Sequence, residues 1–178
     1  LDSGTKQSYT MAVEWWKKAA HQGHAEAQNN VGNMYRNGHG VKQSYEKAVE
    51  WFEKSAKQGL ANAQDNLSDM YANGRGVNQS YKKALELLEK AVEKGHTNAQ
   101  NNLGAMYMNG LGVKQNYKEA RKWYAKAAEK GHADALNNLG SMYGNGLGVK
   151  RNYSEARKWY EKAAEAGHAQ AQFHLGVL

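Results

Sequence analysis

The sequence predicts an all-α protein built from tandem helix-turn-helix repeats of 36 residues. A tyrosine returns at this interval, and the residues around it return too, at Tyr9, Tyr45, Tyr81, Tyr117 and Tyr153. Proline, which costs a helix interior about 3 kcal/mol, is absent. The 19 glycines recur at fixed places in each repeat. Repeats of this length are typical of solenoids, in which each repeat buries its apolar face against its neighbours.

The first helix of a repeat is expected over 25–38 in the first complete copy. Its apolar residues fall at offsets i, i+4, i+7 and i+8, which is one face of a helix. They are Ala27, Val31, Met34 and Tyr35. Gly32 stands beside this face, and we expect it to allow another helix to approach closely, because glycine has no side chain. The helix ends at Asn37-Gly38, a pair that favours a left-handed backbone.

The second helix is expected over 45–58 and begins after Ser44, whose hydroxyl suits an N-cap. Two later repeats use Asn116 or Asn152, each with a glutamate three residues on, which approximates a capping box. The apolar stripe of the second helices carries an aromatic pair in three of the four complete repeats, and we expect it in the core. The pairs are Trp51 and Phe52, Trp123 and Tyr124, and Trp159 and Tyr160.

The repeats define a single array over residues 1–178. The complete repeats are 25–60, 61–96, 97–132 and 133–168, and partial repeats cover 1–24 and 169–178. Links of one or two residues force antiparallel neighbours, so we expect ten helices, from about 9–22 to about 169–178. Residues 4–9 match 40–45, and the chain stops where other repeats continue into Met-Tyr, so we expect a fragment of a longer repeat array.

The fourth complete repeat shows a pattern of small, aromatic and glycine residues most fully. It includes Ala133, Ala135, Asn138, Leu139, Gly140, Met142, Tyr143, Asn145, Gly146, Gly148 and Val149, then Tyr153, Ala156, Trp159, Tyr160, Lys162, Ala163, Ala164 and Gly167. The pattern resembles the Sel-one-like repeat (SLR) family of tetratricopeptide-like solenoids, over essentially the whole chain. The resemblance implies a right-handed α-α superhelix, with the first helix of each repeat on the concave side, and a role as an adaptor or scaffold.

Some positions depart from the family pattern. Ser68 replaces the glycine of the first helix, and Leu87 and Leu88 replace the aromatic pair of the second. Leu60 stands where the other repeats have a histidine. Those histidines are His24, His96, His132 and His168. A cysteine-rich bacterial branch of the family is linked to β-lactam binding, but this chain lacks that branch's disulfides, so the activity is not carried over.

The candidate binding surface is the polar side of the first helices, which the resemblance places in a groove. Its residues are Asn29, Asn30, Asn33, Arg36, Asp65, Asn66, Asp69, Asn101, Asn102, Met108, Asn137, Asn138 and Ser141. An asparagine amide offers two donors and an acceptor, so it can bind a peptide backbone without reading its sequence. The row that recurs once per repeat has a second interpretation, in which each amide binds the neighbouring helix or loop. This row is Asn30, Asn66, Asn102 and Asn138.

Asp65 and Asp69 form an i,i+4 acidic pair on this face. Like charges at that spacing are unfavourable, so a partner is expected. Three interpretations stay open. The pair is solvated or paired locally, with Arg36 as a candidate partner, or it receives a basic spot on a protein ligand, or it serves a metal or catalysis.

Composition and spacing argue against several classes of site. Without cysteine there are no disulfides or thiolate sites. Histidines at one turn position, translated along a stack, cannot converge on one metal, so we expect them to serve the turns and expect no cofactor. The net charge of +7 lies mainly on second helices, interleaved with glutamates, and indicates a solvated surface; no nucleic acid is expected. No apolar run approaches the length of a membrane span, so we expect a soluble chain without membrane insertion, in an unassigned compartment.

The sequence therefore predicts a non-catalytic scaffold that binds a protein or peptide in the groove. Neither Ser68 nor Ser141 has a histidine or lysine at a suitable spacing on its own helix to activate it as a nucleophile. Two alternatives stay open. One is a β-lactam-binding or β-lactam-hydrolysing envelope protein, and the other is a scaffold whose basic convex face binds anionic surfaces.

Overall fold

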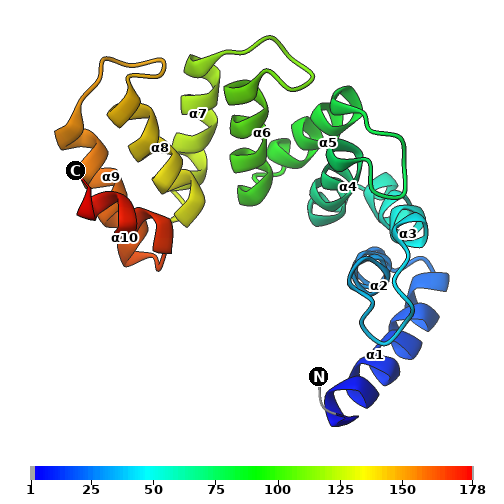
Figure 1. Ribbon diagram of the computed structural model, residues 1–178. Helices are drawn as coiled ribbons and strands as arrows, with labels where there is room; N and C mark the ends of the chain where they lie inside the picture. The colour runs from blue at the N-terminus through cyan, green and yellow to red at the C-terminus, as the bar shows by residue number, and fades with distance from the viewer. Residues whose placement is uncertain (1–2, 178) are drawn as a thin grey trace. The chain divides into compact units, whose positions relative to one another are not determined.

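The computed structural model describes residues 3–177, which contain ten helices and no strand (Figure 1). The helices are α1 (Ser3–His21), α2 (Ala25–Asn37), α3 (Tyr45–Lys57), α4 (Ala61–Asn73), α5 (Tyr81–Glu93), α6 (Thr97–Asn109), α7 (Tyr117–Ala128), α8 (Ala133–Asn145), α9 (Tyr153–Glu165) and α10 (Ala169–Gly176). The predicted all-α class, with paired helices in each 36-residue repeat, is confirmed. None of these helices is both long and apolar enough to cross a membrane.

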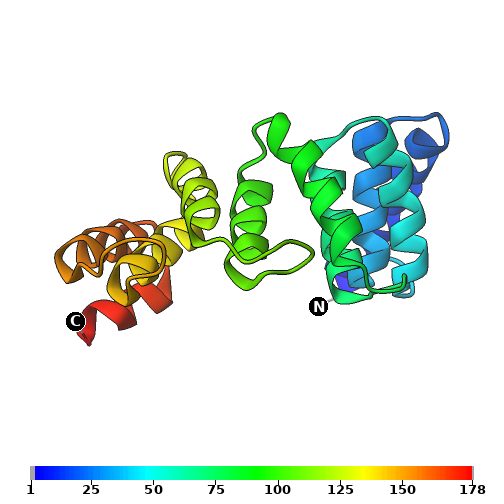
Figure 2. The same cartoon turned by 90° about the horizontal axis from the view of Figure 1, so that it is seen from above.

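The chain divides into two compact parts, one ending at Lys94 and the other beginning at Gly95. Within each part, consecutive helices pack on one another as antiparallel neighbours (Figures 1 and 2). In the first part α2 packs on α3 and α4 on α5, and in the second α6 packs on α7 and α8 on α9. The first helices of the repeats are thus the even-numbered ones, and the second helices are the odd-numbered ones.

The first helix of the chain begins earlier than expected, at Ser3 instead of near residue 9. In later repeats the equivalent segment is a loop held by the preceding helix. The Ser44 N–H, for example, donates to the Tyr35 carbonyl at 2.9 Å, and the Ser80 N–H donates to the Tyr71 carbonyl at 2.9 Å. In the first repeat, residues 3–8 are part of α1 instead.

The predicted N-caps of the second helices are confirmed. The Ser44 hydroxyl accepts the Lys47 N–H at 3.3 Å, and the Asn152 amide oxygen accepts the Glu155 N–H at 3.1 Å. The Glu155 carboxylate lies 2.6 Å from the Lys158 amine. This hydrogen bond and charge raise the pKa of Lys158. Of the two hydrogen bonds of a capping box, the one from the glutamate N–H to the N-cap side chain is therefore formed. The side chain of this glutamate pairs with a lysine.

The turn histidines cap the first helices. In α2 the His24 Nδ1 accepts the Ala27 N–H at 3.2 Å. The same bond is made by His96, His132 and His168, at 3.2, 3.4 and 3.1 Å. At the start of α4, Leu60 stands in this position and makes no side-chain cap. The expected turn role is thus an N-cap, with an imidazole nitrogen as the acceptor.

We expect Leu60→His to raise the free energy of unfolding by about 1 kcal/mol, because it supplies the acceptor that α4 lacks. The measurement is urea unfolding near pH 8, where the imidazole is neutral. Leu60→Ala is the matched control, since it removes the leucine without adding an acceptor. Equal stability of the two variants would contradict the capping role.

The helical glycines allow an aromatic ring to pack directly on the backbone, as Gly32 led us to expect. A Cβ at Gly32 would lie 2.6 Å from the Phe52 ring. A Cβ at Gly104 would lie 2.7 Å from the Tyr124 ring, and a Cβ at Gly140 would lie 2.6 Å from the Tyr160 ring. In the second complete repeat, Ser68 replaces the glycine and Leu88 replaces the aromatic residue. The two departures therefore fall at facing positions.

The aromatic pairs of the second helices divide between core and surface. Phe52, Tyr124 and Tyr160 are buried, which confirms the core prediction for them. The tryptophans beside them are half-buried, and Trp51 and Trp159 pack against the buried clusters at the edge of the core. Each tryptophan has a lysine amine over its ring, because a lysine follows it by three residues on the solvated side. The distances from amine to ring centre are 4.3 Å for Lys54 and Trp51, 4.3 Å for Lys126 and Trp123, and 4.9 Å for Lys162 and Trp159.

Candidate functional site

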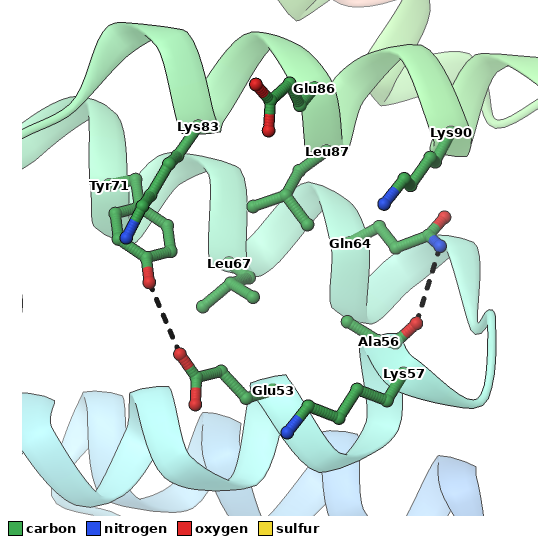
Figure 3. A pocket seen from close by; sticks show the side chains of 10 residues that line it. All are labelled: Glu53, Ala56, Lys57, Gln64, Leu67, Tyr71, Lys83, Glu86, Leu87 and Lys90. Atoms are coloured by element: carbon green, nitrogen blue, oxygen red, sulfur yellow. Dashed lines mark hydrogen bonds between the residues drawn. The ribbon is translucent and has the colours of Figure 1, made fainter.

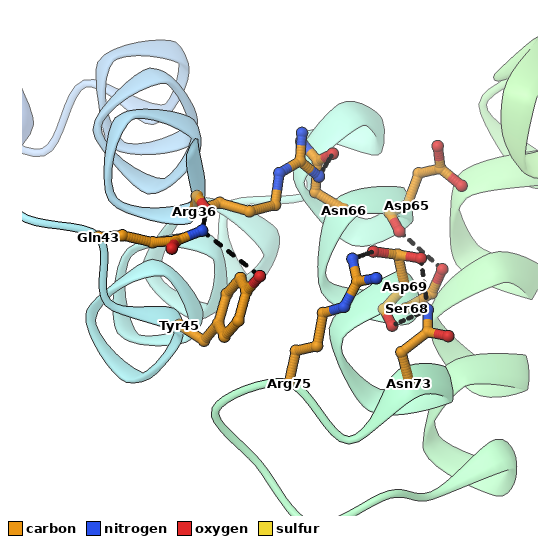
Figure 4. A network of polar contacts seen from close by, with 9 residues as sticks. All are labelled: Arg36, Gln43, Tyr45, Asp65, Asn66, Ser68, Asp69, Asn73 and Arg75. Atoms are coloured by element: carbon orange, nitrogen blue, oxygen red, sulfur yellow. Dashed lines mark hydrogen bonds and ion pairs between the residues drawn. The ribbon is translucent and has the colours of Figure 1, made fainter. Parts of the chain in front are cut away.

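The polar side of α2 and α4 is held together by hydrogen bonds between side chains (Figure 4). The Asn66 amide nitrogen donates to the Asn29 amide oxygen at 2.9 Å, and Arg36 Nη1 donates to the Asn66 oxygen at 2.9 Å. Asn29 is buried. Arg36, the candidate partner of the acidic pair, therefore binds a neutral amide instead.

The second part of the chain repeats this arrangement. The Asn138 amide nitrogen donates to the Asn101 oxygen at 3.1 Å. His174, which occupies in α10 the position that Asn138 has in α8, contacts the Asn137 oxygen through Nδ1 at 3.2 Å. These bonds, like that between Asn66 and Asn29, join residues 37 positions apart. For Asn66 and Asn138, binding to the neighbouring helix is thus the observed arrangement.

The acidic pair is engaged locally in part. Asp69 accepts the Asn73 amide at 2.7 Å through one oxygen, and its other oxygen lies 3.7 Å from Arg75 Nη1. Asp65 is half-buried, and its main-chain carbonyl accepts the Ser68 hydroxyl at 2.7 Å. Local pairing therefore accounts for Asp69. Across residues 3–177, no three His, Cys, Asp or Glu side chains are grouped so as to hold a metal ion.

A hollow of about 610 Å³ opens beside Asp69 (Figure 4). Arg36, Gln43, Tyr45 and Arg75 contribute to its lining. The Gln43 amide donates to the Arg36 carbonyl at 2.8 Å, and the Arg75 guanidinium lies 5.9 Å from the centre of the Tyr45 ring. Two guanidinium groups beside one carboxylate leave a net positive charge. Guanidinium groups bind carboxylates strongly, so the hollow suits an acidic group of a ligand.

Five lining residues of this hollow lie outside the predicted surface, namely Asn37, His39, Gln43, Tyr45 and Arg75. Gln43 and Tyr45 belong to the repeat pattern, which predicts a loop position for Gln43 and a core position for Tyr45. Arg75 carried a signal, because the other repeats place His39, Leu111 or Leu147 at its position. An arginine that occurs once at a loop position is a candidate for a specific contact. Its place beside Asp69 depends on how the loop folds over α4.

Ser141 belongs to α8 and lies beside Tyr160, a buried tyrosine of α9. Its hydroxyl accepts the Asn145 amide at 3.2 Å and also hydrogen-bonds the Tyr160 phenol. Burial raises the pKa of Tyr160, although the bond with Ser141 lowers it in part. Burial alone raises the pKa of Tyr124 to about 12. Burial thus favours the protonated phenol at both positions.

The remaining candidates are partly covered. Met108 is half-buried against the core of the second part, so it contributes to packing there. Asn30 and Asn102 are half-buried at the same position of α2 and α6. Asn33 has a buried amide oxygen that meets no hydrogen-bond partner within the described part of the chain. The structure therefore places these residues along the first helices of their repeats.

Comparisons with known proteins agree with this architecture. The family model of the Sel1 repeat matches residues 2–24, 25–60, 61–96, 97–132 and 133–168. The chain is similar to the crystal structure of a Sel1 repeat protein from Oxalobacter formigenes, with a TM-score of 0.89 and 34% identity over 93% of this chain and 66% of that one. No curated protein matches the chain.

Two further solved structures are similar. One is c5321, a protective antigen present in uropathogenic Escherichia coli strains with an SLR fold, at a TM-score of 0.85 and 41% identity over 95% of this chain and 36% of that one. The other is the immunity protein Pa5087 from Pseudomonas aeruginosa, at a TM-score of 0.65 and 25% identity over 96% of this chain and 69% of that one. The chain thus spans just under two thirds of the Oxalobacter protein and about a third of the antigen.

Proposed function

This chain belongs to the Sel1 repeat family, and from that premise we propose that it is a non-catalytic scaffold that binds a protein or peptide along the polar side of its first helices. The family resemblance implies that this side lines a concave groove. The observation that supports the proposal most is the positively charged hollow beside α2 and α4. The antigen and the immunity protein among the similar structures are not named for an enzymatic activity.

The asparagine bonds favour such a role because they hold the amides in place. Each asparagine amide has two N–H groups. The Asn66 nitrogen uses one of them for Asn29, and the Asn138 nitrogen uses one for Asn101. The second N–H of each group could donate to a backbone carbonyl of a ligand. A side chain already held in one conformation loses less entropy on binding.

We propose that the partner presents a carboxylate to the hollow. Arg36 contacts neutral groups there, namely the Asn66 amide and the Phe52 ring, whose centre is 5.7 Å from the guanidinium carbon. Arg75 lies 3.7 Å from Asp69, farther than a charge-assisted hydrogen bond. A carboxylate entering the hollow would therefore find guanidinium donors that are not saturated by close anionic partners.

The double variant Arg36→Glu/Arg75→Glu is expected to weaken the partner at least about tenfold, because it reverses the charge of the hollow. Asp69→Asn is expected to tighten binding, since it removes a competing carboxylate. The partner would be isolated with the wild-type chain, and its affinity for each variant measured by titration calorimetry.

Lys122→Glu/Lys126→Glu is the matched control, because it makes two equal charge changes on the outer surface of α7. Circular dichroism would show that every variant is folded. Equal affinity of the hollow variant and the control would reject the hollow as the binding site. Chemical conversion of the partner by the wild-type chain would reject a non-catalytic role.

A further inference from the structure

A pocket of about 350 Å³ lies between α3, α4 and α5, away from the hollow (Figure 3). Ala56, Leu67 and Leu87 form its apolar floor, and Tyr71 stands at one side. Charged side chains surround its mouth. They are Glu53, Lys57, Lys83, Glu86 and Lys90. An apolar floor with a polar rim and this volume is typical of pockets that hold a small group.

The repeats show which group fills this place elsewhere. Leu87 occupies the position that a tryptophan has in the three other complete repeats, at Trp51, Trp123 and Trp159. One repeat earlier, Trp51 packs against a buried cluster that contains Ala20 and Val31 and against which Tyr35 also packs. The counterparts of these three residues are Ala56, Leu67 and Tyr71, which line the pocket. The pocket is thus the space that an indole occupies in the preceding repeat.

The lysine that accompanies each tryptophan is retained beside the pocket. Lys90 occupies the position of Lys54, Lys126 and Lys162. Those amines lie 4.3, 4.3 and 4.9 Å from the centres of their indole rings. Leu87 offers no π face, so the cation–π arrangement of the other repeats is missing its ring here.

We propose that this pocket binds a tryptophan side chain carried by a protein partner, whose indole completes the packing that Leu87 leaves open. The apolar floor receives the ring, and Lys90 lies over its face as the lysines of the other repeats do. Glu86 stands on the rim (Figure 3) and offers its carboxylate to the indole N–H. The Tyr71 hydroxyl donates to Glu53 at 3.3 Å, which fixes one wall. This site differs from the first-helix surface of the proposed function.

The probe for the test is N-acetyl-L-tryptophanamide, titrated into the full chain with leucine methyl groups labelled for NMR. We expect saturable ring-current shifts of the Leu67 and Leu87 methyls, with a dissociation constant on the order of 1 mM for a single side chain. N-acetyl-L-leucinamide, which tests apolar binding without a ring, is expected to cause no saturable chemical-shift change of any kind at these methyls. Leu87→Trp should weaken binding at least about tenfold, because its own indole fills the pocket.

Lys90→Ala keeps the test decisive if Leu87→Trp misfolds. It should weaken the probe severalfold, whereas the matched Lys126→Ala variant, whose neighbouring indole belongs to the chain itself, should not. Absence of saturable shifts, or equal binding by Lys90→Ala and wild type, would overturn the proposal. The methyl shifts are also measured without the probe at rising protein concentration. If they grow with concentration and vanish when the exposed Trp15 is changed to alanine, a second copy of the chain fills the pocket, and the proposal is overturned.

Discussion

A tyrosine in place of Leu88 is expected to lower the free energy of unfolding by about 2 kcal/mol, because overpacking a filled site forces side chains and backbone apart. Leu88 is 2% exposed. In the other repeats an aromatic ring at this position lies against a glycine, as Tyr124 does against Gly104, where an added Cβ would be 2.7 Å from the ring. Here the facing residue is Ser68, whose Cβ occupies that space.

Changing Ser68 to glycine should restore most of the stability of the Leu88→Tyr variant, although glycine alone costs helix α4 some propensity. A double-mutant cycle by urea unfolding should therefore give a coupling free energy of about 1–2 kcal/mol. The mirror cycle, Gly140→Ser with Tyr160→Leu, is the control in the second part of the chain. Additive effects in both cycles would show that these positions do not compensate one another.

Alkaline pH is expected to destabilise the protein through Tyr124. Burial raises its pKa to about 12, whereas a tyrosine in an unfolded chain has a pKa of about 10. The protonated phenol is therefore favoured in the folded state. Its contribution is complete below about pH 10 and is lost as the pH rises towards 12, by roughly 2–3 kcal/mol in total.

Tyr124→Phe should remove this part of the pH dependence, because phenylalanine does not titrate. Phe52 fills the equivalent place in the first complete repeat, so the ring itself is accommodated. Unfolding free energies would be measured by urea from about pH 8 to 11.5. Tyr153→Phe is the control, since Tyr153 is 57% exposed. The prediction fails if the two variants lose stability with pH in parallel.

The fold was predictable because its signals are local and repeated. The offsets of Ala27, Val31 and Tyr35 report one face of a helix, and Ser44 and Gly38 mark where helices begin and end, as the structure confirms. The histidine caps were harder to assign, because imidazole serves many purposes and only the geometry at His24 shows the nitrogen accepting an N–H.

The surface was less predictable, because its chemistry depends on which neighbour a side chain meets. From the sequence, a recurrent asparagine is equally compatible with a ligand contact and with a hydrogen bond to the neighbouring repeat. Only the packing of α4 on the preceding repeat brings Asn66 to Asn29. The pocket at Leu87 also required the structure. The sequence shows that a tryptophan is replaced at Leu87. It does not show that Leu67 and Tyr71 leave the space of the missing indole open.

The hydrogen bonds described between repeats join only adjacent repeats. Gln58 donates to the Gly23 carbonyl, Asn66 binds Asn29 and Lys130 donates to the Gly95 carbonyl, at sequence separations of 35 to 37 residues. Each copy carries a donor for the one before it and an acceptor for the one after it. If a gene of this kind gains or loses one whole 36-residue repeat, the repeats brought next to each other still carry complementary donors and acceptors. The number of repeats can therefore change in whole steps while the hydrogen bonds between adjacent repeats are kept.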